Sequence, residues 1–299
     1  MNSRRKRGGS IIGEGMQGIA FSPPLLCKNR QPNIIRNNGS SSPRNYSRSS
    51  PFRKTRKTYV SKITKKNVAN TEIYAAEQLR KSIDPFGRFT APALVSCEAS
   101  NIQTNANYKN RKNNINSRGL NTLVFSRYRG KTLESIFDEI DQYKFLDILL
   151  ILIALSNLLI DVAININGKS GILHYDAHFR NIVYDSATKD AALIDFGFAR
   201  PVDPEIQRAI IEKRFDEIPP TLDIQKIHDE AILQFFMFGN SPPTSLLLAN
   251  PYINKWYAVA KNFRKTKPTL KDYLDSVDNL KHSIIISELS FTNSEPDSE

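Results

Sequence analysis

The pattern of apolar and polar residues along the chain predicts both strands and helices. It predicts strands over 58–63 and 123–125, a hairpin over 181–194, and helices over 70–83, 143–166 and 222–238. Asn70 or Thr71 would cap the first helix, and Asp84-Pro85 would end it. Together these elements indicate an α+β fold.

The most apolar run of the chain, residues 148–160, lies inside the second predicted helix. It is too short to span a bilayer, and Ser156 and Asn157 interrupt it. We therefore expect a buried core helix and no membrane partner.

Basic charge is concentrated at the start of the chain. Residues 1–66 hold 16 Lys and Arg and one acidic residue, whereas the remainder holds 26 basic and 29 acidic residues. Low-complexity composition predicts that residues 1–10, an insert over 28–57 and an acidic tail over 289–299 are disordered. Such a basic arm can bind nucleic acid, an anionic surface or an acidic protein.

Cysteine content and the N-terminus bear on the compartment. Cys27 and Cys97 do not make a disulfide framework in a chain of 299 residues, so we expect both to be reduced, partly buried thiols. Basic residues rather than an apolar segment follow Met1, so no secretory signal is predicted. We expect an intracellular protein.

One polar motif lies around the predicted hairpin. H-x-D-x-x-x-x-N begins at His174 and ends at Asn181, and D-F-G begins at Asp195. The hairpin would place Asp176, Asn181 and Asp195 at its ends. An acid that accepts a hydroxyl proton, with Asn and Asp ligands for Mg²⁺, suits phosphoryl transfer. The alternative is a set of turn carboxylates in an unrelated α+β domain.

A glycine motif lies near the N-terminus. Gly13, Gly15 and Gly18 form G-x-G-x-x-G after an apolar pair. A dinucleotide site would need a helix directly after Gly18, and Pro23-Pro24 prevent one. We therefore predict a strand–glycine turn–strand flap whose backbone N–H groups approach phosphates.

A lysine in the first alternating strand has two candidate partners. Val60 and Lys62 share one face of this strand. Glu72 has apolar neighbours three, four and seven residues later, whereas Glu77 has basic ones. Glu72 is therefore the preferred partner of Lys62.

These motifs, taken together, resemble the catalytic core of the protein-kinase superfamily. Pro-Pro-Leu-x-Cys, Ile-Asp-Pro and Tyr-x-Gly-Lys-Thr-Leu elements resemble the serine/threonine kinases of large DNA viruses over residues 11–200. The resemblance implies a bilobal kinase-like fold. Its small β-rich N-lobe, with one main helix, would cover residues 11–128, and a reduced helical C-lobe would cover residues 129–288.

The resemblance also implies ATP and Mg²⁺ as cofactors and a role for each site residue. Asp176 would accept the hydroxyl proton, and Asn181 and Asp195 would hold the metal. Lys62, fixed by Glu72, would bind the α- and β-phosphates. The implied nucleotide-binding residues are Ile12, Gly13, Gly15, Gly18, Ala20, Val60, Lys62, Ser126 and Tyr128, the last two in a hinge over 126–129.

Several positions depart from the kinase pattern. His178 stands where most protein kinases carry Lys, and we hypothesise that it donates to the γ-phosphate. Gln17 and Ala20 replace an aromatic residue and a valine, which suggests a looser roof over the nucleotide. Tyr175 replaces the Arg that pairs with a phosphorylated activation loop, so we expect no such switch. Asp223 or Asp229 would brace the catalytic loop.

The function implied by the resemblance is that of a viral serine/threonine protein kinase, in host cytoplasm or virion. Its substrates would be proteins, including basic or virion proteins. A small-molecule kinase of the aminoglycoside or choline type is one alternative. Another is a non-catalytic scaffold whose basic arm binds nucleic acid. Physiological substrate and oligomeric state stay open.

Overall fold

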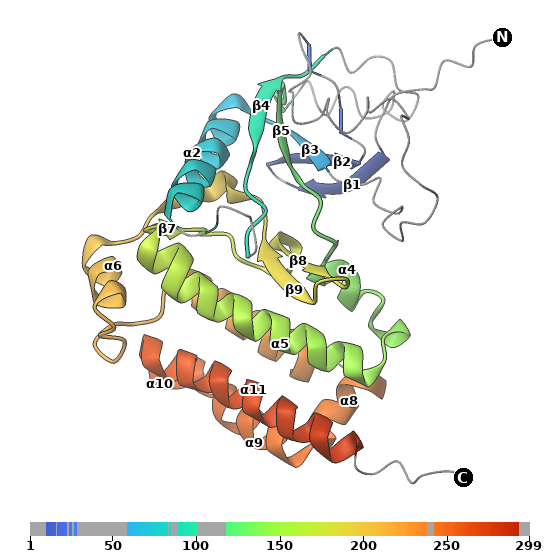
Figure 1. Cartoon of the computed structure of the whole chain (residues 1–299), viewed down its shortest axis with the longest axis vertical. Helices are drawn as coiled ribbons and strands as arrows, with labels where there is room; N and C mark the ends of the chain where they lie inside the picture. Colours follow the sequence, from blue (N-terminus) through green and yellow to red (C-terminus); the bar gives the residue numbers. More distant parts are fainter. Residues whose placement is uncertain are drawn as a thin grey trace, which may run out of the picture. The chain divides into compact units, whose positions relative to one another are not determined.

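The chain has an α+β architecture in which a small antiparallel sheet precedes a mainly helical region (Figure 1). The computed structural model describes residues 10–15, 17–22, 24–25, 27–28, 59–82, 84, 89–100, 118–237 and 242–292. Most of the predicted disordered segments over 1–10 and 28–57 lie outside these residues. The chain divides into two compact units, residues 1–77 with 91–128 and residues 78–90 with 129–299, called unit 1 and unit 2 below.

Unit 1 contains a five-stranded antiparallel sheet with the order β1-β2-β3-β5-β4. Its strands are β1 (Ser10–Gly15), β2 (Gly18–Ser22), β3 (Tyr59–Thr64), β4 (Val95–Glu98) and β5 (Thr122–Arg127). The glycine motif forms the β1–β2 hairpin, as predicted. The expected hinge is partly wrong, because Ser126 pairs with Val60 and thereby belongs to β5.

Helix α2 (Lys66–Ser82) begins four residues before the predicted cap at Asn70. The prediction placed the start too late because Thr71 has the chemistry of a capping residue. In the structure its hydroxyl donates to the carbonyl of Asn67, one turn earlier, which is a contact typical of a helix interior.

The sheet of unit 1 buries different side chains on its two faces. On one face, Val124 of β5 packs with Ala69 and Ala76 of α2. On the other face, its neighbours Leu123 and Phe125 belong to a second apolar cluster. This alternation follows from the two-residue period of a strand, and it makes the face with Val124 the helix-covered face.

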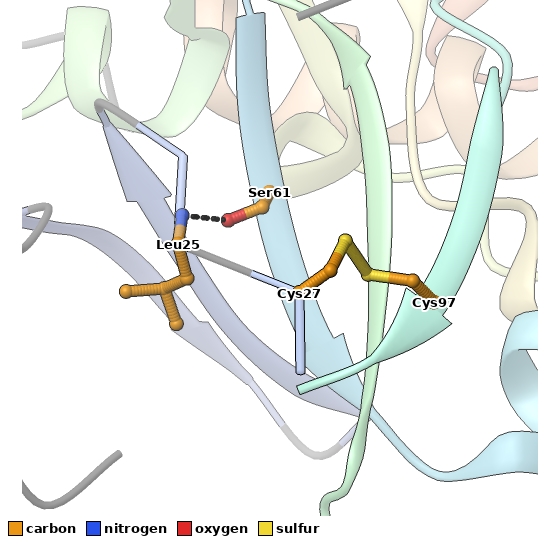
Figure 2. Close-up of a disulfide and its surroundings, with 4 residues drawn as sticks. All are labelled: Leu25, Cys27, Ser61 and Cys97. Carbon is orange, nitrogen blue, oxygen red and sulfur yellow. Dashed lines mark hydrogen bonds between the residues drawn. A yellow bond between two sulfur atoms is a disulfide. The ribbon is translucent and has the colours of Figure 1, made fainter. Parts of the chain in front are cut away.

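Cys27 and Cys97 form a disulfide, so the expectation of two reduced thiols is wrong (Figure 2). The segment that leaves β2 turns back over the sheet, where the Leu25 N–H donates to Ser61 Oγ at 2.8 Å. This return brings Cys27 beside the edge strand β4. The 70-residue separation of the two cysteines gives no hint of the approach.

Unit 2 is mostly helical. Its helices are α4 (Leu133–Phe137), α5 (Phe145–Asp161), α6 (Pro204–Ile211), α7 (Leu222–Ala231), α8 (Pro242–Ala249), α9 (Pro251–Ala260), α10 (Phe263–Thr266) and α11 (Leu270–Thr292). A π-helical segment extends α5 (Val162–Lys169), and another extends α7 (Ile232–Met237). The boundary predicted for the tail, residue 289, is wrong because no glycine or proline interrupts α11 before Thr292.

Short strands complete unit 2. They are β6 (Lys131–Thr132), β7 (Ile172–Leu173), β8 (Ile182–Asp185), β9 (Asp190–Leu193) and β10 (Arg200–Pro201). Strands β8 and β9 pair as the predicted hairpin, with β6 beside β8, and β10 pairs with β7. The hairpin thus separates the H-x-D-x-x-x-x-N motif from D-F-G, as expected.

Helix α5 is the core helix that the apolar run predicts. It packs against α11 and β9. One helix among the described residues, Phe145–Lys169, is long and apolar enough to cross a membrane. Inside the fold, 56% of its most apolar 18-residue stretch is buried. Its buried side chains are Ile148, Leu149, Ile151, Leu152, Ala154, Leu155, Ser156, Leu158 and Leu159.

Candidate functional site

Strand register in unit 1 decides where Lys62 points. Lys62 lies in the middle of β3, opposite Ala20 of β2 and Val124 of β5. Directly opposed residues of an antiparallel sheet project to the same face. Because Val124 packs against α2, Lys62 also faces this helix.

The predicted ion pair between Lys62 and Glu72 is present. Lys62 Nζ lies 2.9 Å from Glu72 Oε1, and the two side chains are only 15% and 8% exposed. Glu77, the competing partner, is exposed on α2. An unpaired charge at this depth would be strongly disfavoured, so each partner holds the other in place.

The tip of the β1–β2 hairpin is fastened to β3. Gln17 Oε1 accepts a hydrogen bond from Lys62 Nζ at 3.2 Å, and Thr64 Oγ1 donates to the Gln17 carbonyl at 2.5 Å. A Cβ on Gly18 would lie 2.2 Å from the carbonyl oxygen of Ile63, so only glycine fits there. These two bonds fasten the tip to β3, whereas the looser roof over the nucleotide suggested by Gln17 and Ala20 stays a prediction. Sequence reasoning missed these bonds, since no spacing rule joins the turn to β3.

The other expected nucleotide-binding residues of β1 and β2 fall along the hairpin. Gly13 pairs with Ala20, and Gly15 pairs with Gly18 beside the turn. Ile12 lies at an irregularity of the pairing and is 47% exposed.

Val60 lies two residues before Lys62 in β3, so both project to the same face of the sheet. Ser126 of β5 lies opposite Val60 on that face. Tyr128 follows the end of β5. The register thus places Ala20, Val60 and Ser126 on the lysine face of the sheet.

The loop that follows β7 in unit 2 brings three predicted site residues into contact. Asn181 Nδ2 donates to the carbonyl of Asp176 at 3.0 Å and to its Oδ2 at 3.1 Å. His178 Nε2 lies 3.5 Å from Asp176 Oδ2. Since both Asp176 atoms only accept hydrogen bonds, the amide nitrogen of Asn181 must face them. Asn181 Oδ1 is left over and accepts no hydrogen bond from any described residue.

Asp195 directly follows Ile194, whose backbone connects the end of the β8–β9 hairpin to this loop. The Ile194 N–H donates to the carbonyl of Asn181 at 2.9 Å. Asp195 itself has φ 64° and ψ 66°, a left-handed conformation that costs a residue with a Cβ roughly 1–2 kcal/mol. Such strain is typical of functional sites.

His174 links the loop to the D-F-G segment. Its Nδ1 accepts from the Asp176 N–H at 3.3 Å, and its Nε2 lies 2.8 Å from the carbonyl of Ile194. An imidazole that accepts at Nδ1 and faces a carbonyl with Nε2 is the neutral tautomer with its proton on Nε2. The buried ring also contacts Phe196 edge to face, with centroids 4.6 Å apart.

Asp223 holds the loop after β7 in place, and it is one of the two residues predicted to do so. Its carboxylate accepts from the backbone N–H groups of His174 at 2.7 Å and Tyr175 at 2.8 Å. Asp229, the other alternative, instead has Oδ1 3.8 Å from Nδ1 of its neighbour His228.

Glu230 is a further contact of the loop that sequence reasoning missed. Its Oε2 accepts from the Phe179 N–H at 2.7 Å. Burial raises the pKa of Glu230, while that hydrogen bond and the nearby His178 lower it by less. Glu230 follows Asp223 by seven residues, so both lie on one face of the helix, and this spacing could have indicated it.

The ring of Tyr175 contacts two cationic side chains. Arg200 Cζ lies 4.3 Å from the centroid of its ring and Lys226 Nζ lies 5.7 Å from it. Lys226 Nζ also donates to the Tyr175 carbonyl at 2.8 Å. With φ at 69°, the backbone of Tyr175 is left-handed, so these contacts hold a strained residue next to Asp176.

The donor set can be tested against Mg²⁺. The described residues contain no group of three or more His, Cys, Asp and Glu side chains that could hold a metal ion. Mg²⁺ commonly needs only one or two protein oxygens, with water and phosphate oxygens completing its shell. The carboxylate of Asp195 and the unbonded Oδ1 of Asn181 fit that requirement.

Comparison with known proteins adds no relative. No protein-family model matches the chain, and no curated protein matches it. The interpretation of the site therefore depends on the residues and distances described above.

Proposed function

We propose that the chain is an ATP- and Mg²⁺-dependent serine/threonine protein kinase with a bilobal kinase-like fold. The observation that carries the proposal is the contact of Asp176 with Asn181, whose amide oxygen has no hydrogen-bond donor among the described residues. This contact orients the carboxylate of Asp176 and leaves the amide oxygen of Asn181 available as a metal ligand. Both residues lie on the loop that Asp223 holds. Phosphoryl transfer uses both parts, a residue that orients the attacking hydroxyl and oxygen ligands for Mg²⁺.

The residues of unit 2 would act on the substrate hydroxyl and on the metal. Asp176 orients the hydroxyl and accepts its proton, a role that requires the fixed carboxylate that Asn181 provides. Asn181 Oδ1 and the Asp195 carboxylate hold Mg²⁺. The bound ion neutralises phosphate charge. His178 donates to the γ-phosphate, and its ring lies within 3.5 Å of Asp176 Oδ2.

The residues of unit 1 would hold the nucleotide. Lys62, kept in place by Glu72, binds the α- and β-phosphates as a point charge. Ala20 and Val60 offer apolar contact to the base from the same face of the sheet. Catalysis is then mostly positioning and charge neutralisation.

A transfer assay tests the proposal against its two alternatives. Purified full-length chain is incubated with Mg²⁺ and ATP labelled in the γ-phosphate, together with either a basic protein or a panel of alcohols. We expect label in protein. Label in the alcohols would favour a small-molecule kinase, and salt-sensitive nucleic-acid binding without any transfer would favour the scaffold.

Matched variants identify the residues responsible. Asp176→Asn and Lys62→Met are expected to lower the rate at least about 100-fold, as removal of a catalytic base or phosphate ligand does. The exposed Asp141→Asn and Lys65→Met are the matched controls. Full activity of both site variants in a clean preparation would refute the proposal, and an unchanged kcat in His178→Ala would remove His178 from it.

A further inference from the structure

Gln17, at the turn of the β1–β2 hairpin, has a buried hydrogen-bond donor that no described residue satisfies. Lys62 Nζ lies 3.2 Å from the Gln17 amide, and an ammonium can only donate, so the atom facing it must be Oε1. The other amide atom, Nε2, is buried and has no hydrogen-bond partner among the described residues. An unsatisfied buried donor is costly, so it indicates a missing acceptor.

The position of this amide is fixed by its surroundings. Thr64 Oγ1 donates to the Gln17 carbonyl at 2.5 Å, and Gly18 lies so close to β3 that a Cβ would meet the Ile63 carbonyl at 2.2 Å. The turn therefore presents Nε2 beside the Lys62 ammonium. Two neighbouring donors, one of them charged, suit an anion with at least two acceptor oxygens.

We propose that Gln17 Nε2 binds the polyphosphate of a nucleoside triphosphate, next to the phosphate oxygen that Lys62 binds. The inference rests on the proposed function for the identity of the anion, since it takes ATP as the nucleotide. Gln17 is then a substrate-binding residue at the position where an aromatic tip was expected. Its Oε1 stays on Lys62, and this contact polarises the amide and strengthens Nε2 as a donor.

A different role for Gln17 makes opposite predictions. If its amide only fastens the hairpin to Lys62, it competes with phosphate for the ammonium. Gln17→Met, which keeps the length of the side chain and removes both polar atoms, would then leave polyphosphate affinity unchanged or increase it. If Nε2 is a phosphate donor, the same variant weakens binding, because a charge-assisted hydrogen bond is lost.

Calorimetric titration of the full chain distinguishes the two roles. The ligands are MgATP, inorganic tripolyphosphate and AMP, and the variants are Gln17→Met, Gln17→Glu and the exposed control Gln142→Met. We expect both Gln17 variants to bind MgATP and tripolyphosphate about tenfold or more weakly, with a smaller change for AMP. Gln17→Glu keeps an acceptor for Lys62, so its melting temperature should stay at or above that of the wild type.

The outcomes separate this inference from the kinase proposal. If the wild type binds MgATP and Gln17→Met binds it equally well or more tightly, the role of Gln17 is overturned and the kinase proposal still stands. Polyphosphate binding that depends on Gln17, without any phosphate transfer, supports the role of Gln17 and counts against the kinase proposal. Absence of polyphosphate binding in the folded wild-type chain overturns both.

Discussion

Asp223 in α7 accepts a hydrogen bond at 2.8 Å from the backbone N–H of Tyr175, which lies 48 residues earlier in the chain. Its other oxygen accepts from the His174 N–H at 2.7 Å and from Asn167 Nδ2 at 3.1 Å. The carboxylate is fully buried. One side chain thus fixes the backbone that carries Asp176, although it lies outside the motif itself.

Asp223→Asn should therefore weaken both the fold and the loop. The substitution turns an amide nitrogen toward at least one of the three donors, and leaving a buried donor unsatisfied costs about 1–3 kcal/mol. Denaturant unfolding measures the loss of stability, and kcat at a temperature where the variant is folded measures the effect on Asp176. Stability and kcat equal to those of the exposed control Asp141→Asn would contradict this account.

Two of the glycines of the hairpin, Gly13 and Gly18, make a matched pair for a steric test. A Cβ on Gly18 would lie 2.2 Å from the Ile63 carbonyl oxygen, whereas a Cβ on Gly13 would lie 3.9 Å from Ala20 Cβ, an ordinary contact. Gly18→Ala should lower the free energy of unfolding by roughly 1–3 kcal/mol, because β2 must move away from β3. Gly13→Ala should change it by less than about 1 kcal/mol. Thermal or urea unfolding of both variants provides the comparison, and equal losses would show that the close approach at Gly18 has no energetic effect.

The disulfide joins the segment after β2 to the edge strand β4 (Figure 2). Lys28 adds two contacts there, since its backbone N–H donates to the Glu98 carbonyl and its Nζ pairs with the Glu98 carboxylate, both at 2.8 Å. Exposed ion pairs contribute little, so the covalent bond is the main restraint. Disulfides persist mainly in oxidising compartments.

Removing this disulfide should destabilise unit 1. For a loop closed across 70 residues, restriction of the unfolded chain contributes about 4 kcal/mol. The Cys27→Ser, Cys97→Ser double variant should therefore melt at a lower temperature than the oxidised wild type, and reductant should shift only the wild type. Alkylation followed by intact-mass measurement reports the thiol content. Labelling of both cysteines in native protein that has never been reduced would show that the bond is absent.

Sequence periodicity could predict those parts of the site that depend on one strand or one helix. The alternation of β3 placed Val60 and Lys62 on one face, and the apolar neighbours of Glu72 identified it over Glu77. The β8–β9 hairpin was predictable because a polar turn separates two short β-rich runs. Each of these inferences needs only local period and side-chain chemistry.

Contacts set by the return path of the chain could not be predicted in this way. Cys27 meets Cys97 because the segment after β2 turns back over the sheet, and Gln17 meets Lys62 because β2 pairs with β3 beside the hairpin turn. The start of the hinge was misplaced because pairing with β3 extends β5 through Ser126.

Glu230 makes the stability of the fold depend on pH, and the sign of this dependence follows from its pKa. Burial raises its pKa above the ordinary value of 4.5, so the folded chain binds this proton more tightly than the unfolded chain does. The stability contributed by Glu230 is then fully present below the unfolded pKa and is lost as pH rises through the raised folded pKa. Glu230→Gln stays neutral and keeps an oxygen for the Phe179 N–H, so it avoids that loss.

The Gln variant and the wild type should therefore be equally stable in acid, and the variant should become the more stable of the two as pH rises above the ordinary Glu range. Unfolding by urea at a series of pH values from about 3.5 to 8 measures this difference, since the interval brackets the usual Glu pKa. The exposed Glu77→Gln is the matched control. If Glu230→Gln instead became less stable than the wild type as pH rises, the hydrogen bond from Phe179 and the attraction of His178 and Arg180 would outweigh burial. The ionised carboxylate would then stabilise the loop.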